Sequence, residues 1–271
     1  MKGLFKELDW RGSGYFGFPI HRDQPDFVSE EDAARWGTFE SILAALKAGR
    51  PSDILQLPEL FDDEGSWVVR RAYCELMADA GDRRLFEKIG PAVRNVIEPT
   101  YAVQWGRVLC EWGNLSVVPD ILTALRNLIG FDDAEDLALA LGKMLDSTEG
   151  DEFAGTRFND IEGFLPVAEA RYKKLANLFG SDNLVVLKGE RFSVARLAEL
   201  TLDSLNAPTF DPFMRRKFEA NTGIDCTSFF DSNGALDSVQ ATTIVADFLD
   251  SDKLRAFAPG QRYFFRHAIA D

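Results

Sequence analysis

The sequence predicts a mainly α-helical protein, either a HEAT-like α-solenoid or an irregular helical bundle, with one small β-hairpin. Three observations lead to this prediction. Apolar residues recur at steps of three and four along most of the chain, similar helical segments recur 32 residues apart, and a single stretch has β character. At 271 residues, 46% hydrophobic and 27% charged, the chain is long enough to bury a core without disulfides.

The N-terminal segments predict a loop followed by two helices. The first 25 residues mix glycine, proline and aromatic residues, which favours an ordered loop. Ser29 can cap a helix that carries Trp36 on its apolar face and ends near Gly49. A short helix over 54–60 then ends at the acidic turn of residues 62–64.

A weak repeat follows. Two stretches of sequence are similar to each other, residues 67–82 and residues 101–114, and the stretch 137–147 lies where a third copy would fall. A second apolar segment follows each of the first two copies. Helix pairs at this period are typical of a solenoid, in which each pair covers the apolar face of its neighbour. The repeat lacks a strict consensus, so an irregular bundle stays open. Residues 1–150 are predicted to be a helical-repeat region.

Residues 151–271 are predicted to be a C-terminal helical region with a hairpin, packed on the first region as one continuous fold. A polar connection over 146–158 leads to a helix over 161–179. Two β-prone runs around Lys188-Gly189-Glu190 then predict a hairpin at 184–194. Further helices are expected after Ser193, over 211–220 and around 244–248, before an aromatic tail.

The charge balance is strongly acidic. The chain has 44 acidic and 30 basic residues, a net charge of −14, of which residues 1–150 carry −10 and residues 151–271 carry −4. Because nucleic-acid affinity depends on Lys and Arg, direct DNA or RNA binding is disfavoured. The carboxylates either maintain solubility or attract a basic partner.

Targeting and cysteine patterns point to the cytoplasm. No segment approaches the roughly 20 apolar residues of a membrane span, and Glu7 and Asp9 fall where a signal peptide needs an apolar region. The chain has three cysteines, Cys74, Cys110 and Cys226, which is an odd number, and none of them has CxxC spacing. We therefore expect them to be buried small side chains rather than parts of disulfides or of a zinc site.

Signatures of catalysis are scarce, and the sequence predicts no enzyme, no metal and no cofactor. The chain has only two histidines, His21 and His267, and no phosphate loop, nucleophile elbow or HExxH motif. The carboxylate clusters lie at predicted turns and helix starts, where capping favours Asp and Glu. His267 lies in the aromatic tail, where a packing role is expected. A hydrolase that uses a carboxylate cluster and His267 is the enzymatic alternative.

The C-terminal region resembles a family of immunity proteins from bacterial polymorphic-toxin and contact-dependent inhibition systems. The resemblance covers about a fifth of the chain and lies in Lys217-Phe218-Glu219, in residues 222–226 (TGIDC) and in residues 259–267 (PGQRYFFRH). A Gly often stands in that family where this chain has Arg266. The resemblance implies a protein that neutralises one cognate toxin by binding it, without catalysis of its own. Such toxin domains are often nucleases, which are basic, so an acidic inhibitor would complement them.

We expect the matched aromatic tail to hold the fold and the toxin contact to lie elsewhere. A HEAT-like scaffold that binds a peptide or protein partner is the remaining alternative. The tryptophans are either core residues or, on a concave face, aromatic anchors for a partner. The candidate toxin-binding residues are Asp132, Asp133, Glu135 and Asp136, then Asp62, Asp63 and Glu64, with Trp105 and Trp112.

Overall fold

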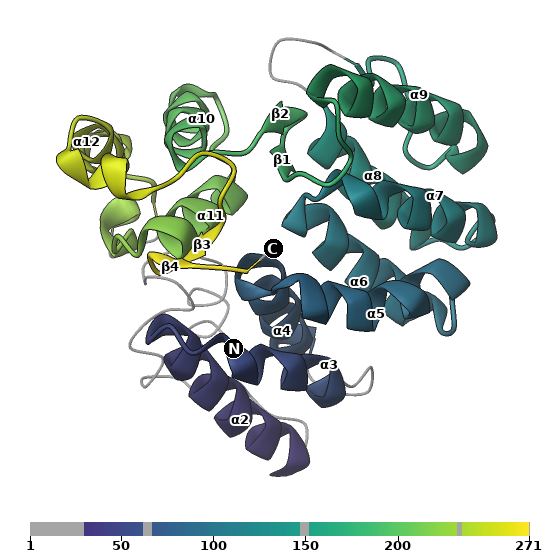
Figure 1. The fold of residues 1–271 in the computed structure, drawn as a ribbon, viewed down its shortest axis with the longest axis horizontal. Coiled ribbons are helices and arrows are strands. Elements are labelled where there is room, and N and C mark those ends of the chain that lie inside the picture. Colours follow the sequence, from purple (N-terminus) through teal and green to yellow (C-terminus); the bar gives the residue numbers. More distant parts are fainter. Residues whose placement is uncertain (1–29, 62–66, 147–151, 232–234, 271) are drawn as a thin grey trace. The chain divides into compact units, whose positions relative to one another are not determined.

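A computed structural model describes residues 30–61, 67–146, 152–231 and 235–270 (Figure 1). The described chain is mainly helical with two short antiparallel strand pairs, which confirms the predicted fold class. It divides into two compact units. Unit 1 combines residues 1–80 with residues 193–271, and unit 2 comprises residues 81–192.

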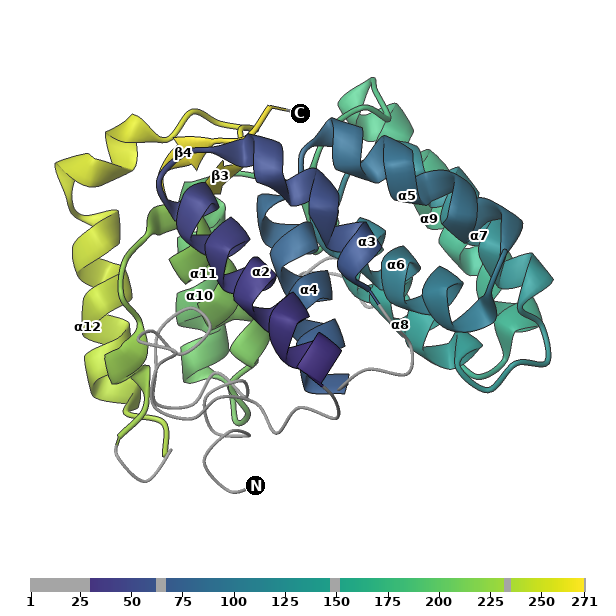
Figure 2. The same ribbon diagram turned by 90° about the horizontal axis from the view of Figure 1, so that it is seen from below.

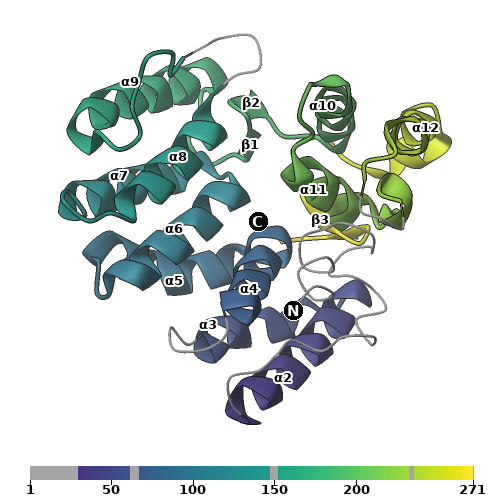
Figure 3. The ribbon, with the colours of Figure 1, turned by 180° about the vertical axis from the view of Figure 1, so that it is seen from behind.

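Unit 1 joins helices from the two ends of the chain. Helix α2 packs against α4, α4 packs against α11, and α10 packs against both α11 and α12 (Figures 2 and 3). Its helical elements are α2 (Glu30–Lys47), η2 (Pro51–Gln56), α3 (Leu57–Leu60), α4 (Trp67–Ala80), α10 (Val194–Asn206), α11 (Pro212–Thr222), η4 (Thr227–Phe229), α12 (Ser238–Leu249) and η5 (Asp252–Ala256).

Unit 2 contains two successive helix pairs. Helix α5 packs against α7 and α6 packs against α8, so the pair α5/α6 stacks on the pair α7/α8, and α9 covers α7 and α8. This stacking buries the apolar face of each pair. The elements are α5 (Arg83–Asn95), α6 (Pro99–Trp112), η3 (Leu115–Val117), α7 (Val118–Asn127), α8 (Ala134–Leu145) and α9 (Ile161–Phe179).

Helix ends follow the capping residues of the sequence. The Ser193 hydroxyl accepts a hydrogen bond from the Arg196 N–H at 3.1 Å and begins α10, as predicted. Asp82 caps α5 and Glu98 caps α6 in the same way. Gly113 ends α6 in the left-handed conformation, as expected for a residue without a Cβ.

Two small hairpins complete the described fold. Strands β1 (Val186–Leu187) and β2 (Glu190–Arg191) pair where the sequence predicts a hairpin. A second pair, β3 (Tyr263–Phe264) and β4 (His267–Ala268), lies in the aromatic tail and was not predicted. The turn of this second pair is formed by Phe265 and Arg266, so no glycine marks it in the sequence, whereas Gly189 marks the turn of the first pair.

The core of each unit is apolar and aromatic. Trp36 stacks on Phe39 in unit 1, and Phe86 stacks on Trp112 in unit 2 with ring centres 3.9 Å apart. Cys110 and Cys226 are buried as predicted, and burial raises the pKa of both thiols, whereas Cys74 is half-buried. No helix in the described ranges is long and apolar enough to span a membrane.

Candidate functional site

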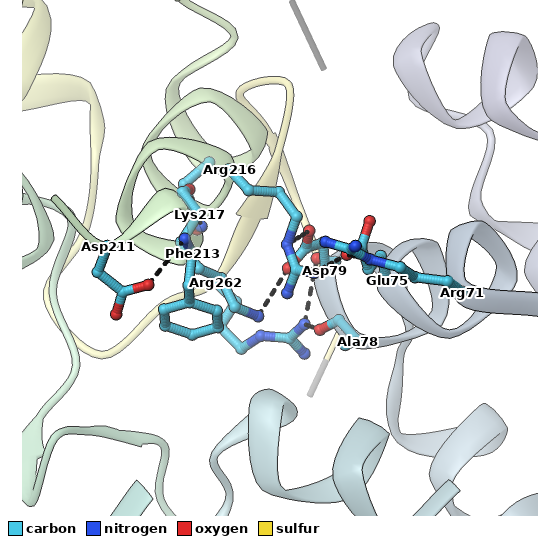
Figure 4. Close-up of polar contacts among 10 residues, drawn as sticks. Arg71, Glu75, Ala78, Asp79, Asp211, Phe213, Arg216, Lys217 and Arg262 are labelled. Carbon is cyan, nitrogen blue, oxygen red and sulfur yellow. Dashed lines mark hydrogen bonds and ion pairs between the residues drawn. The ribbon is translucent and has the colours of Figure 1, made fainter. Parts of the chain in front are cut away.

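A cluster of buried charges joins helices α4 and α11 in unit 1 (Figure 4). The Arg216 guanidinium lies 3.1 Å from Glu75 Oε1 and 3.1 Å from Asp79 Oδ2, and Lys217 Nζ lies 2.6 Å from Asp79 Oδ1. All four side chains are buried. These four residues form the buried charge cluster.

The helices bring these groups together by spacing and capping. Glu75 and Asp79 are four residues apart on α4, so both carboxylates leave the same face of the helix. Asp211 caps the start of α11 by accepting a hydrogen bond from the Phe213 N–H at 3.1 Å. Arg216 and Lys217 follow in the same helix. The two cations of the cluster lie 5.3 and 5.4 Å from the centre of the Phe213 ring.

The C-terminal tail contacts the same end of α4. Arg262 Nη2 donates hydrogen bonds to the carbonyl oxygens of Ala78 at 2.8 Å and Asp79 at 3.2 Å. These carbonyls belong to the last turn of α4, where a helix leaves acceptors unsatisfied. The buried carboxylates face protein cations at close range, so the arrangement acts as an electrostatic crosslink between α4, α11 and the tail.

The turn between β3 and β4 caps helix α11. The Phe265 and Arg266 N–H groups donate to the carbonyls of Ala220 at 2.6 Å and Asn221 at 3.2 Å, and Arg266 Nε donates to Thr222 O at 2.9 Å. Both turn residues have positive φ, 47° and 70°, which L-residues adopt at a cost of about 1–2 kcal/mol each. The Arg266 position is therefore one that favours Gly, and here the arginine side chain adds a cap that Gly lacks.

The end of helix α2 meets the same hairpin. His267 Nε2 lies 3.1 Å from the Lys47 carbonyl oxygen, and the exposed imidazole packs on Gly49. Lys47 Nζ lies 4.3 Å from the centre of the Phe265 ring. Burial lowers the pKa of Lys47 to about 8, although Glu219 and Asp225 oppose this shift. His267 thus lies in a structural contact, as expected, but at the surface.

The first set of predicted site residues is exposed in unit 2. Asp132 and Asp133 lie in the turn between α7 and α8, and Glu135 and Asp136 lie in the first turn of α8. Arg107 Nη1 lies 3.6 Å from Asp136 Oδ2, and both side chains are exposed. Within the described residues, the other three carboxylates have no cation at ion-pair distance. These four residues form the acidic turn.

The remaining candidates do not join the acidic turn. Asp62, Asp63 and Glu64 lie outside the described residues. Trp105 and Trp112 are 9% and 5% exposed and pack on Tyr101 and Phe86. Both tryptophan side chains belong to the core of unit 2, because the stacked helix pairs cover the faces that carry them. They therefore do not form an exposed aromatic anchor.

The buried charge cluster is the feature that the sequence did not predict. Arg215-Arg216-Lys217 is visible in the sequence, but a run of three cations is normally a solvated helix face. The signal available was the four-residue spacing of Glu75 and Asp79 on a helix whose other charged residues are Arg70 and Arg71. In the described ranges no group of three or more His, Cys, Asp or Glu side chains is arranged to hold a metal ion.

Comparison of the chain with protein-family models, with curated proteins and with solved structures finds no match.

Proposed function

We propose that this chain is an immunity protein that acts in the bacterial cytoplasm, where it binds and neutralises a cognate toxin domain and has no catalytic activity of its own. The observation that carries the proposal is the acidic turn, whose four carboxylates are exposed on a chain of net charge −14. The resemblance of the C-terminal region to immunity proteins supplies the class of partner.

The electrostatics favour a basic partner. Clustered like charges on an exposed surface attract a complementary surface over a distance set by the salt concentration, about 10 Å at 0.1 M. Such steering raises the association rate well above that of neutral surfaces. A nuclease toxin is basic because it must bind phosphate, so its surface complements that of this chain.

The buried charge cluster and the tail have a different role in this proposal. They hold α4, α11 and the residues of the family resemblance together in unit 1. The residues that resemble the immunity-protein family therefore maintain the fold, while binding of the toxin uses an exposed surface.

A scaffold that binds a peptide or another protein is the second candidate, favoured by the stacking of α5/α6 on α7/α8. A scaffold predicts binding without protection of cells. Survival of a toxin-expressing cell therefore separates the two functions.

The experiment is co-expression rescue. Where a neighbouring gene encodes a large secreted protein, its short C-terminal domain is induced in a susceptible bacterium, with and without this chain, and colony counts are compared. We expect the chain to restore growth against this toxin domain but not against an unrelated toxin of similar charge. No rescue, with both proteins present in the cell, would contradict the proposed function.

A further inference from the structure

Exposed apolar side chains gather at one end of unit 2. Five large apolar side chains are exposed in the described part of the chain, and three of them belong to two short turns of unit 2. Ile97, 75% exposed, follows α5, while Ile129 and Phe131, 45% and 51% exposed, follow α7. Because most large apolar residues are buried, three in two neighbouring turns need an explanation.

The two turns lie at the same end of the helix stack. Helices α6 and α8 pack side by side, and both finish at the β1–β2 hairpin. There the Val186 N–H donates to Gly113 O, and the Gly189 N–H donates to Met144 O. The N-terminal ends of α6 and α8, which follow residues 96–98 and 128–133, therefore lie together at the opposite end, as Figures 1 and 2 show.

The first turn holds Ile97 outward by a fixed backbone. Val96 has φ 46° and ψ 53°, a left-handed conformation that costs a β-branched residue about 1–3 kcal/mol. The Val96 and Ile97 N–H groups donate to Val93 O and Ala92 O, and the Glu98 carboxylate caps α6 at Tyr101 N at 2.7 Å. In helices that end with a left-handed residue, the apolar residue after it usually packs back onto the helix, but here Ile97 is exposed.

We propose that Ile97, Ile129 and Phe131, together with the acidic turn, form the surface on which the cognate toxin domain docks through an apolar patch surrounded by basic residues. We call this surface the turn face. The inference rests on the proposed function and names its contact site. Phe131 is adjacent in sequence to Asp132 and Asp133, so apolar and acidic groups share one surface.

Charge complementarity selects this partner over a second copy of the chain. Two copies that met through the turn face would bring two acidic turns together, and like charges across an interface disfavour association. A basic partner gains from the same carboxylates. The two kinds of side chain then have separate effects, since exposed charges mainly set the association rate and apolar anchors mainly set the dissociation rate.

The test measures binding kinetics with the toxin domain against which the chain protects cells. The variant I97S/I129S/F131S removes the apolar part of the turn face. The matched control is L178S/V239S, because Leu178 and Val239 are 70% and 77% exposed and lie outside the turn face. Surface substitutions of this kind change stability little, and melting curves of all variants verify that they fold.

We expect the triple variant to dissociate about tenfold faster or more, with a nearly unchanged association rate, while the control matches the parent. A folded triple variant that dissociates as slowly as the parent overturns the turn face but leaves the proposed function standing. Absence of rescue by the parent chain overturns both. Sedimentation would overturn the inference if it showed that the parent chain is a dimer and the triple variant a monomer. A second copy of the chain would then be the occupant of the turn face.

Discussion

Lys217 Nζ lies 2.6 Å from Asp79 Oδ1, and this buried ion pair joins two helices from opposite ends of the chain. Arg216 reaches the same carboxylate and also Glu75. Asp79 therefore balances two cations that are both removed from solvent, and it links α4 to α11 through two ion pairs.

The first prediction is that Asp79→Asn strongly destabilises the protein. The variant keeps the side-chain shape but leaves two buried cations without their shared anion, which costs about 3–5 kcal/mol of unfolding free energy. Urea denaturation measures the loss. The control is Glu87→Gln, which removes an exposed ion pair with Arg83 and should cost less than about 1 kcal/mol. Equal small losses would show that the cluster does not hold the fold.

The second prediction concerns His267. His267→Ala removes the contact with the Lys47 carbonyl and the packing on Gly49, so we expect a loss of about 0.5–1.5 kcal/mol and a lower melting temperature. Protection against the toxin should persist at growth temperatures below the melting transition. A variant that melts like the parent but fails to protect cells would assign His267 to recognition instead.

The third prediction compares two glycines with similar backbones. Gly113 and Gly180 both end helices with positive φ, 83° and 68°. A Cβ at Gly113 would overlap the Val186 carbonyl oxygen, whereas nothing lies within 4 Å of a Cβ at Gly180. Gly180→Ala should cost about 1–2 kcal/mol of unfolding free energy from the backbone alone, and Gly113→Ala distinctly more. Similar melting temperatures for the two variants would contradict the close contact of α6 with β1.

The fourth prediction is a rise of stability at alkaline pH that depends on Lys47. Its pKa is about 8 in the folded protein against 10.5 for an unperturbed lysine. Between these values the unfolded chain binds more protons than the folded one, so the unfolding free energy rises with pH. We expect a contribution of about 1–2 kcal/mol between about pH 7.5 and about pH 9.5.

Lys47→Met serves as the comparison, because other groups also titrate in this range. The difference in unfolding free energy between parent and variant, measured in urea at both pH values, isolates the lysine. A difference that does not change with pH would show that Lys47 has an ordinary pKa in the folded protein.

The fifth prediction concerns the acidic turn. Changing its four carboxylates to lysine should lower the association rate with the toxin domain by about tenfold or more at low salt. The loss should shrink as salt screens the charges. The comparison is the same change at four exposed aspartates of unit 1, which alters the net charge equally: Asp203, Asp247, Asp250 and Asp252.

Folding is followed in parallel, because Glu135 and Asp136 also favour the start of α8 by about 0.3–1 kcal/mol each. An unchanged association rate for the folded acidic-turn variant would remove this turn from the interface. Salt-independent binding by the parent chain would contradict electrostatic steering altogether.

Local signals in the sequence determined much of the secondary structure. Apolar spacing located the helices, Ser193 marked the start of one of them, and Lys188-Gly189-Glu190 located the first hairpin. These features depend on residues within a few positions of one another, and the physics of capping and turns is local. The exposure of Asp132 and Asp133 also followed from their position in a turn.

Only the tertiary structure decided which surfaces the helices bury. Helix α11 carries Arg215, Arg216 and Lys217, yet all three are buried, because carboxylates of α4 and aromatic rings accompany them. A sequence cannot show that pairing, since the partners are distant along the chain and burial of a charge is favourable only when the partner is in place. The same holds for the tail, where the positive φ of Phe265 and Arg266 is compensated by the carbonyls of α11.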